Sequence, residues 1–244
     1  SSFNSGCSST MEELEQPWRP KLPLCDTAID LKAANKILSS AQTREKCLKI
    51  FQYTARLLGY ILLRGSFKDL GKHFEALSKS LSTARRFFKL FRFMKHFEDL
   101  ADAKEEKDPT FQKLLYLDVA ANVVADISED WTSLEKVGIL RKGTLHPRTE
   151  YYANWCQLVL AVVEIVVTKI KADRATEKAS KPDASKEVLR KKTMAQLEFS
   201  KFLADLVKAF WDCELSFASE FAFILSGLWA ALVSSHKYAI RVLK

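Results

Sequence analysis

The hydrophobic positions along the chain recur mostly at helical spacing. Apolar residues return every three or four positions over several stretches, with polar residues between them. The predicted helices cover residues 27–41, 43–64, 74–100, 110–130 and 150–171, with a last helix or pair of helices over 193–242. Thr43 offers an N-cap oxygen to the second of them, and Pro109 can occupy the first turn of the fourth. Only 7 glycines and 6 prolines occur, too few for the turns of a sandwich or barrel, so an all-α fold is predicted.

Composition divides the chain into four regions. Residues 1–26 are rich in Ser and Pro and are predicted to be a disordered N-terminal segment. Residues 27–171 form a helical region. Residues 172–192 are highly charged and contain Pro182, which predicts a solvated linker. Residues 193–244 are predicted to be a C-terminal membrane helix region.

The most distinctive segment is the predicted helix over residues 74–100, which is both basic and aromatic. No acidic residue occurs between Ala76 and Phe97. At 100° per residue the cations line one face of a helix and the apolar side chains line the other. This pattern is typical of a helix that lies in a membrane interface, with its cations on anionic headgroups. The predicted membrane-binding residues are Arg85, Arg86, Phe87, Phe88, Lys89, Phe91, Arg92, Met94 and Lys95.

Two other interpretations of this segment remain open. A net charge of +8 suits an anionic partner, either a membrane surface or nucleic acid. Nucleic acid is disfavoured because the aromatic side chains lie opposite the cations, whereas a stacking platform presents both to one strand. An ordinary solvated helix is disfavoured because exposed faces usually mix both signs of charge. Anionic lipids are therefore the predicted partner, and no nucleic acid is expected.

The best candidate for a membrane span is Leu215–Ser235, in which Glu220 is the one charged residue. Lys and Arg follow it, which predicts a cytosolic C-terminus. Small residues recur there at every fourth position and favour close helix packing. The predicted helix-packing residues are Ala218, Ala222, Ser226, Ala230 and Ser234. The alternative is a buried helix of a soluble bundle.

A second span over residues 151–170 is a weaker prediction, because Glu164 interrupts it and charge in the membrane is costly. Asp118 and Asp126 argue that residues 111–127 are amphipathic or buried in a bundle. Such acidic groups within apolar runs leave a metabolite channel as an alternative function. Their pairing with Lys or Arg inside a helical bundle is the other explanation.

Catalytic and metal-binding motifs are not evident in the sequence. The five cysteines contain no CxxC pair, and the four histidines are far apart. The sequence contains no nucleophile elbow, phosphate loop or HExxH motif. We therefore expect neither an enzyme nor a bound cofactor or metal.

Several segments resemble the peroxisomal biogenesis factor 11 (peroxin-11) family. They are REKCLKIFQYTARLLGY at 44–60, STARRFFKLFRF at 82–93, the Leu117–Asp118 pair and the tail ILSGLWAALVSSHKYAI. Their order along residues 30–244 is similar to that in the family. The chain departs from the family pattern at Thr83, where Leu is usual, and it exchanges Lys and Arg at Arg86 and Lys89.

The resemblance implies a peroxisomal or glycosomal membrane protein that elongates the organelle before division, with its N-terminus in the cytosol. It implies membrane tubulation by the helix that carries Arg85, Arg86, Lys89 and Arg92. It also implies self-association and cooperation with a dynamin-related fission GTPase and its tail-anchored adaptor. Some members of the family are proposed to conduct metabolites.

Overall fold

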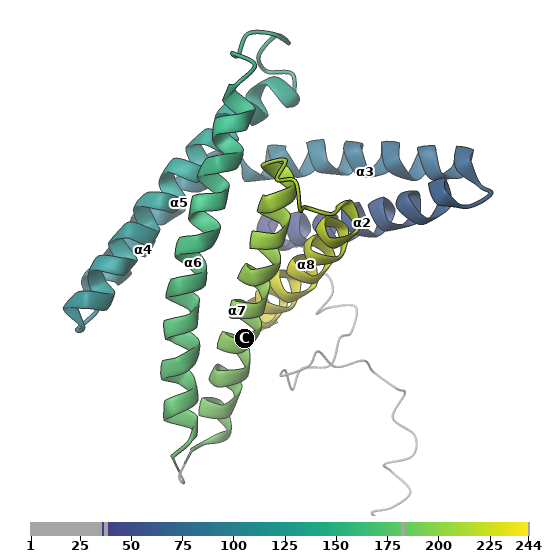
Figure 1. The fold of residues 1–244 in the computed structure, drawn as a ribbon. Helices are drawn as coiled ribbons and strands as arrows, with labels where there is room; N and C mark the ends of the chain where they lie inside the picture. The colour runs from purple at the N-terminus through teal and green to yellow at the C-terminus, as the bar shows by residue number, and fades with distance from the viewer. Residues whose placement is uncertain (1–35, 37–38, 182–183, 244) are drawn as a thin grey trace, which may run out of the picture.

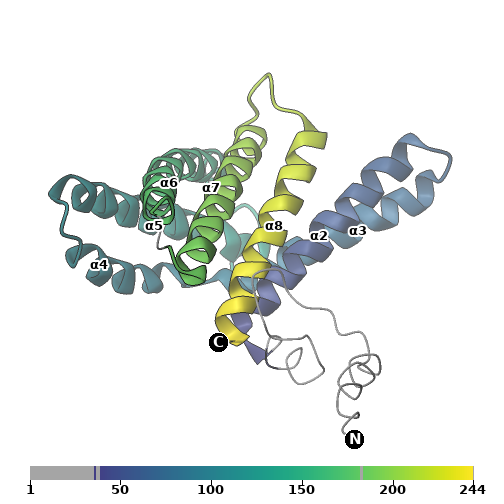
Figure 2. The same ribbon diagram turned by 90° about the horizontal axis from the view of Figure 1, so that it is seen from below.

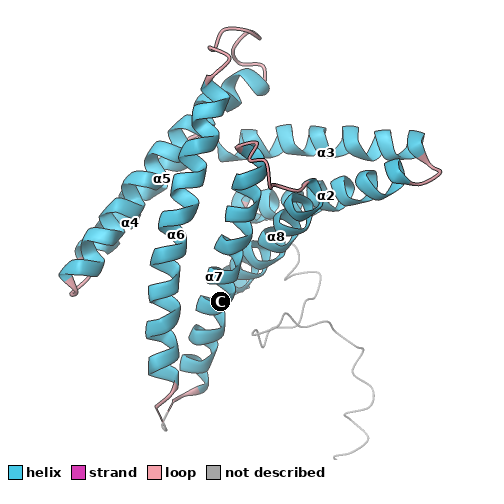
Figure 3. Ribbon diagram, in the orientation of Figure 1, coloured by secondary structure: helices cyan, strands magenta, loops and turns pink. Residues whose placement is uncertain are grey.

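The protein is all-helical in the computed structural model, which describes residue 36 and residues 39–181 and 184–243. Within these residues there is no β-strand, so the prediction of an all-α fold is confirmed (Figure 3). The predicted disordered segment 1–26 and most of the predicted helix 27–41 lie outside the described residues.

The helices form antiparallel pairs that cross one another. The elements are α2 (Ala41–Arg64), α3 (Lys68–Lys89), the 3-10 helix η2 (Arg92–Lys95), α4 (His96–Lys104), α5 (Pro109–Lys136), α6 (Thr149–Ala179), α7 (Lys186–Asp212) and α8 (Glu220–Leu243). The α2/α3 pair projects sideways from the long α6/α7 pair, and α5 packs along α6 (Figure 1). Helix α8 contacts both α2 and α7 and so joins the two pairs (Figure 2).

Two predicted helix starts have different outcomes. Pro109 is the first residue of α5, and the Asp108 carboxylate caps it by accepting hydrogen bonds from the Thr110 and Phe111 amides. The predicted cap at Thr43 is wrong, because α2 begins earlier and Thr43 is buried inside it. The sequence favoured Thr43 because the apolar stripe begins just after it.

The continuous helix predicted over residues 74–100 is wrong, because the chain breaks after Lys89 into α3, η2 and α4. Leu90 is extended, and Phe91 adopts the left-handed conformation with φ 63°. This conformation is strained for a residue with a Cβ. The Phe91 amide donates a hydrogen bond of 2.9 Å to Asp130 Oδ2 on α5, which holds the break in place.

The charged segment 172–192, predicted as a solvated linker between two hairpin arms and partly helical at its end, is mostly helical. Helix α6 continues to Ala179, and α7 begins at Lys186 after a short turn. The segment is rich in Ala, Glu, Lys and Arg, which favour helices, and the Ser185 hydroxyl caps α7 at the Val188 amide. The predicted C-terminal region therefore contains most of α7 and all of α8.

Among the described residues, one helix is long and apolar enough to cross a membrane, and it is α6. Of its most apolar 18 residues, 28% are buried in the protein. The preferred span Leu215–Ser235 does not form one helix, because residues 215–219 are in a turn and α8 begins at Glu220. The weaker of the two predicted spans is thus the one that the structure supports.

The polar residues within the apolar stretch of α6 have partners within the protein. The Asn154 side-chain amide donates to the Asp212 carbonyl at 2.7 Å, and the Gln157 side-chain amide donates to the Ala125 carbonyl at 3.0 Å. The Asn122 side-chain amide on α5 lies 3.3 Å from a Glu164 carboxylate oxygen. These contacts reduce the cost of burying polar groups on the helix.

The small residues of α8 face other helices of the same chain. Ser226, Ala230 and Ser234 are buried, whereas Ala218 lies before the helix and Ala222 is half-buried at its first turn. The closest approach is at Gly227, where a Cβ atom would lie 2.1 Å from the Tyr53 ring of α2. Tyr53 also packs against Phe223, so this contact belongs to the small core shared by α2, α7 and α8.

Gly227→Ala is expected to destabilise the fold by about 1–3 kcal/mol, because the added methyl group overpacks the core. Thermal unfolding in detergent, followed by circular dichroism, measures the change. Gly65→Ala is the matched control, since its Cβ would meet its nearest neighbours at 3.7 Å. If the clash with Tyr53 causes the destabilisation, adding Tyr53→Leu to Gly227→Ala should restore part of the lost stability. Equal melting temperatures for Gly227→Ala and Gly65→Ala would contradict the clash.

Candidate functional site

Most of the predicted membrane-binding cations of the α3–α4 segment point into the protein. Arg85 is buried, and its Nε and Nη2 atoms lie 3.0 and 2.8 Å from Glu45 Oε1 on α2. Its Nη1 atom donates to the Gln52 side chain. Burial alone would raise the pKa of Glu45, but Lys46 and Arg85 hold it well below its usual value. Arg85 therefore ties α3 to α2.

The next cations bind side chains of α5. Arg86 Nη1 donates to Ser133 Oγ at 3.2 Å, and Lys89 Nζ lies 2.6 Å from Glu129 Oε1. Burial lowers the pKa of Lys89 to about 8, although Glu129 acts in the opposite direction. The pKa of Glu129 is held low by Lys89 and Arg92 against the effect of burial.

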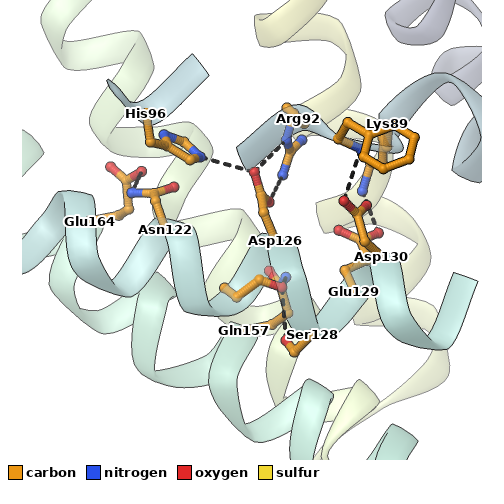
Figure 4. A network of polar contacts seen from close by, with 12 residues as sticks. Lys89, Arg92, His96, Asn122, Asp126, Ser128, Glu129, Asp130, Gln157 and Glu164 are labelled. Carbon is orange, nitrogen blue, oxygen red and sulfur yellow. Dashed lines mark hydrogen bonds and ion pairs between the residues drawn. The ribbon is translucent and has the colours of Figure 1, made fainter. Parts of the chain in front are cut away.

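Asp126 is the centre of the polar network drawn in Figure 4. Its carboxylate accepts hydrogen bonds from Arg92 and from His96 Nε2, the latter at 2.9 Å. The other ring nitrogen of His96 lies 2.9 Å from Asp99 Oδ2. Burial would raise the pKa of Asp126, but His96 and Arg92 lower it to about 2. The explanation of Asp126 as an ion-pair partner in a helical bundle is therefore confirmed.

His96 makes the stability of this network depend on pH. The Asp126 carboxylate raises the pKa of His96, burial opposes the rise and Asp99 adds to it. The stabilisation is fully present below the unfolded-state pKa, about 6.5, and is lost as pH rises through the higher folded-state value.

The melting temperature of the wild type should therefore fall between pH 6 and pH 8, as His96 loses its proton. His96→Gln should show a smaller fall over the same range. The exposed His146 provides the control variant His146→Gln, which should follow the wild-type profile. Parallel wild-type and His96→Gln profiles would show that His96 carries no such stabilisation.

Apolar side chains of the same segment are exposed on the side away from these ion pairs. We call them the apolar surface, and they are Phe87, Phe88, Phe91, Met94 and Phe97. All of these except Phe97 are among the membrane-binding residues predicted from the sequence, and the same three-residue spacing could have identified Phe97. The predicted separation of cations from aromatic side chains is therefore present.

The expected direction of the cations is wrong for most of them. Arg85, Lys89 and Arg92 contact carboxylates of α2 and α5 rather than facing outward, and Lys95 is half-buried. A buried guanidinium or ammonium group is costly unless it is paired, which explains this orientation. The segment can therefore offer a lipid surface its apolar side chains, with fewer cations than the sequence suggests.

A second exposed apolar region lies on α5 and α6, and its aromatic part was not anticipated. Val159, Val162 and Val166 of α6 are exposed along the helix. Exposed aromatic residues gather where the two helices approach their connecting loop, and we call them the aromatic girdle: Trp131, Tyr151, Tyr152 and Trp155. Trp and Tyr are enriched where membrane helices meet the headgroups, so the girdle would mark one end of α6 if it spans.

A polar cavity of about 610 Å³ lies between the helices. Lys and Arg side chains outnumber Asp and Glu side chains in its walls, which include the inward face of the α3–α4 segment. Burial and the Glu164 carboxylate raise the pKa of Asp118 in this cavity. No group of three or more His, Cys, Asp or Glu side chains that could hold a metal ion occurs within the described part of the chain.

Over the residues that the structure describes, these features define an all-helical protein with one candidate membrane helix, an ion-paired interior and exposed aromatic surfaces. Comparison with protein-family models matches residues 31–237 to Peroxisomal biogenesis factor 11 (PEX11). The match covers most of the chain, so the protein belongs to this family of peroxisome biogenesis factors, which is not a known enzyme family. Comparisons with curated proteins and with solved structures give no match.

Proposed function

We propose that the protein remodels and elongates the peroxisomal membrane by inserting the apolar surface of its α3–α4 segment into one leaflet. The observation that carries the proposal is the exposure of Phe87, Phe88, Phe91, Met94 and Phe97 on one short stretch of the chain. A contiguous exposed apolar patch on a folded protein usually marks a membrane or protein contact. Membership of the peroxisome biogenesis family favours the peroxisomal membrane.

The proposed mechanism is a shallow wedge. Each fully buried Phe contributes about 1.5–3 kcal/mol, so a few aromatic side chains suffice to hold the segment in the acyl boundary. Insertion into one leaflet expands that leaflet relative to the other and favours curvature. The ion pairs from Arg85, Lys89 and Arg92 would keep the segment rigid against α2 and α5 while it inserts.

Helix α6 would anchor the protein beside this wedge. Its exposed valines suit the acyl chains, and the aromatic girdle suits the headgroup level. We further propose cytosolic termini, contact with anionic lipids and self-association. Cooperation with a dynamin-related fission GTPase and its tail-anchored adaptor is part of the same proposal and rests on the family resemblance. No catalytic activity is required by this mechanism.

Imaging tests location and remodelling together. The full chain, carrying a fluorescent tag, is expressed at moderate and high levels beside a peroxisomal marker. The proposal requires ring-shaped peroxisomal staining and elongated peroxisomes at the higher level. Diffuse cytosolic staining would contradict membrane association, and ring staining with unchanged peroxisome shape would contradict remodelling alone.

A metabolite channel is the second candidate function, and the polar cavity favours it. The walls of the cavity include Asp118 and Glu164, the acidic groups within apolar stretches of α5 and α6. A water-filled pathway needs such polar walls in a membrane protein. Bilayer recordings with the purified full chain test this function, and a silent bilayer at high protein density would contradict it.

A further inference from the structure

Positive charge is in excess at the part of the cavity between α2, α3 and α7. Four lysines meet there, and we call them the lysine cluster: Lys46, Lys49, Lys201 and Lys208. Lys49 is buried, and Asp205 Oδ1 lies 3.7 Å from its Nζ atom. The other Asp205 oxygen lies 3.0 Å from Lys201 Nζ, so two ammonium groups share one carboxylate.

Glu45 and Asp212, two other carboxylates near the lysine cluster, are also already paired with cations. Glu45 accepts the Arg85 hydrogen bonds and lies 2.6 Å from Lys46 Nζ. Asp212 lies 3.9 Å from Lys208 Nζ and is half-exposed. The lysine cluster and Arg85 thus place five cations against the four carboxylates of Glu45, Asp205, Asp212 and Glu164, the last of which interacts electrostatically with Lys201. Along the same walls, Lys89 with Glu129 and Lys237 with Glu198 are balanced pairs.

Lys49 is the buried member of the lysine cluster and faces the other cations. Burial lowers the pKa of Lys49 well below its ordinary value, and Asp205 offsets only part of this effect. Lys208, Arg85 and Lys46 lower it further by repulsion. A buried ammonium that faces several like charges is stabilised when an anion joins them.

We propose that the lysine cluster binds a phosphate-bearing anion that enters the polar cavity. A phosphate monoester carries up to two negative charges and three strong acceptor oxygens, so it can neutralise several ammonium groups at once. The cavity of about 610 Å³ has the size of a small-molecule site and holds more than a single phosphate group. The anion is either a soluble phosphate ester or the headgroup of an anionic lipid.

This binding site does not depend on membrane insertion by the apolar surface. Binding is measured on the purified full chain in detergent, where no bilayer can be deformed. Loss of vesicle elongation would therefore contradict the proposed remodelling function and leave the anion site standing. Loss of anion binding with normal vesicle elongation would contradict the anion site and leave the proposed remodelling function standing.

The test uses pyrophosphate as the soluble probe, with binding followed by titration calorimetry and by the melting temperature. Wild-type protein is expected to be stabilised, and Lys49→Met should weaken binding at least about tenfold, the effect of losing one charged hydrogen bond. Lys72→Met is the matched control, because Lys72 is 70% exposed and pairs with Asp69 on its own helix. It should bind pyrophosphate as the wild type does.

A second probe identifies the source of the anion. Phosphatidic acid in mixed micelles, compared with phosphatidylcholine, tests the headgroup. If phosphatidic acid stabilises the wild type more than pyrophosphate does, and Lys49→Met loses that effect, the ligand is a lipid headgroup. A stronger effect of pyrophosphate indicates a soluble ester.

Two results would overturn the proposal. One is that neither probe binds the wild type. The other is that Lys49→Met binds either probe as tightly as the wild type. Lys208→Met serves in the same way if circular dichroism shows that Lys49→Met is unfolded, since Lys208 lies at the edge of the cluster and is partly exposed.

Discussion

Replacing Phe87 and Phe91 together with Glu is expected to abolish membrane elongation. The full chain is reconstituted at equal density in vesicles that contain anionic lipid, and tubules are counted by electron microscopy. Losing two buried Phe side chains removes about 3–6 kcal/mol of insertion energy, which lowers occupancy of the inserted state by roughly 10²–10⁴-fold. The number of tubules per vesicle should fall at least about tenfold, because partial insertion cannot hold curvature.

A matched control separates insertion from general loss of apolar surface. Phe67 and Phe217 are 66% and 69% exposed, close to the 64% of both Phe87 and Phe91, but they lie at the helix connections 65–67 and 213–219. Phe67→Glu with Phe217→Glu should leave tubulation unchanged. Equal tubulation by both double variants would show that the α3–α4 segment is not the wedge.

Charge reversal of the basic residues would not test the same idea. Arg85 and Lys89 are held by Glu45 and Glu129 inside the protein, so Glu at those positions would place like charges together. Loss of function in such a variant would report loss of folding. The Phe substitutions lie on the exposed side and leave these ion pairs in place.

Asp126→Ala is expected to cause the largest loss of stability. The substitution leaves Arg92 and His96 without their shared carboxylate, and removal of one partner of a buried ion pair typically costs about 3–5 kcal/mol. In a chain of this size the melting temperature should fall by roughly 6–20 °C. Thermal unfolding in detergent, followed by circular dichroism, measures this fall.

Asp69→Ala is the control for this variant. The Asp69 side chain is 93% exposed and pairs with Lys72 on the same helix, so its loss should cost less than about 1 kcal/mol. A similar melting temperature for the Asp126 and Asp69 variants would mean that the network around Asp126 contributes little to the fold.

The sequence was sufficient to predict the all-α class. It was also sufficient to predict which side chains of the basic segment lie on the cationic face and which lie on the apolar face. Helical periodicity reports which side chains lie together on one face, and the structure places the cations of α3–α4 opposite Phe87, Phe91 and Met94. Pro109 after Asp108 likewise identified the start of α5, because that signal is local. These features depend on residues that are close in sequence.

The partners of the cations could not be predicted from the same pattern. Arg85 and Glu45 are 40 residues apart, and Arg92 and Asp126 are 34 apart, so their contacts depend on how the helices cross. The break at Phe91 is also invisible to periodicity, because η2 and α4 resume the spacing of α3. The choice between α6 and α8 as the candidate membrane helix could not be made from the sequence, because it depends on the residue at which α8 begins.

The left-handed backbone at Phe91 is unfavourable for folding, whereas the aromatic ring at the same position would favour the proposed membrane insertion. Glycine would adopt this conformation without strain and would ease folding, but it would remove an aromatic ring from the apolar surface. Phe91→Gly should therefore melt at a higher temperature and elongate vesicles less well, which the same two assays measure. Under the proposed insertion, position 91 would be a point of compromise, where backbone strain is retained because the aromatic ring enters the bilayer.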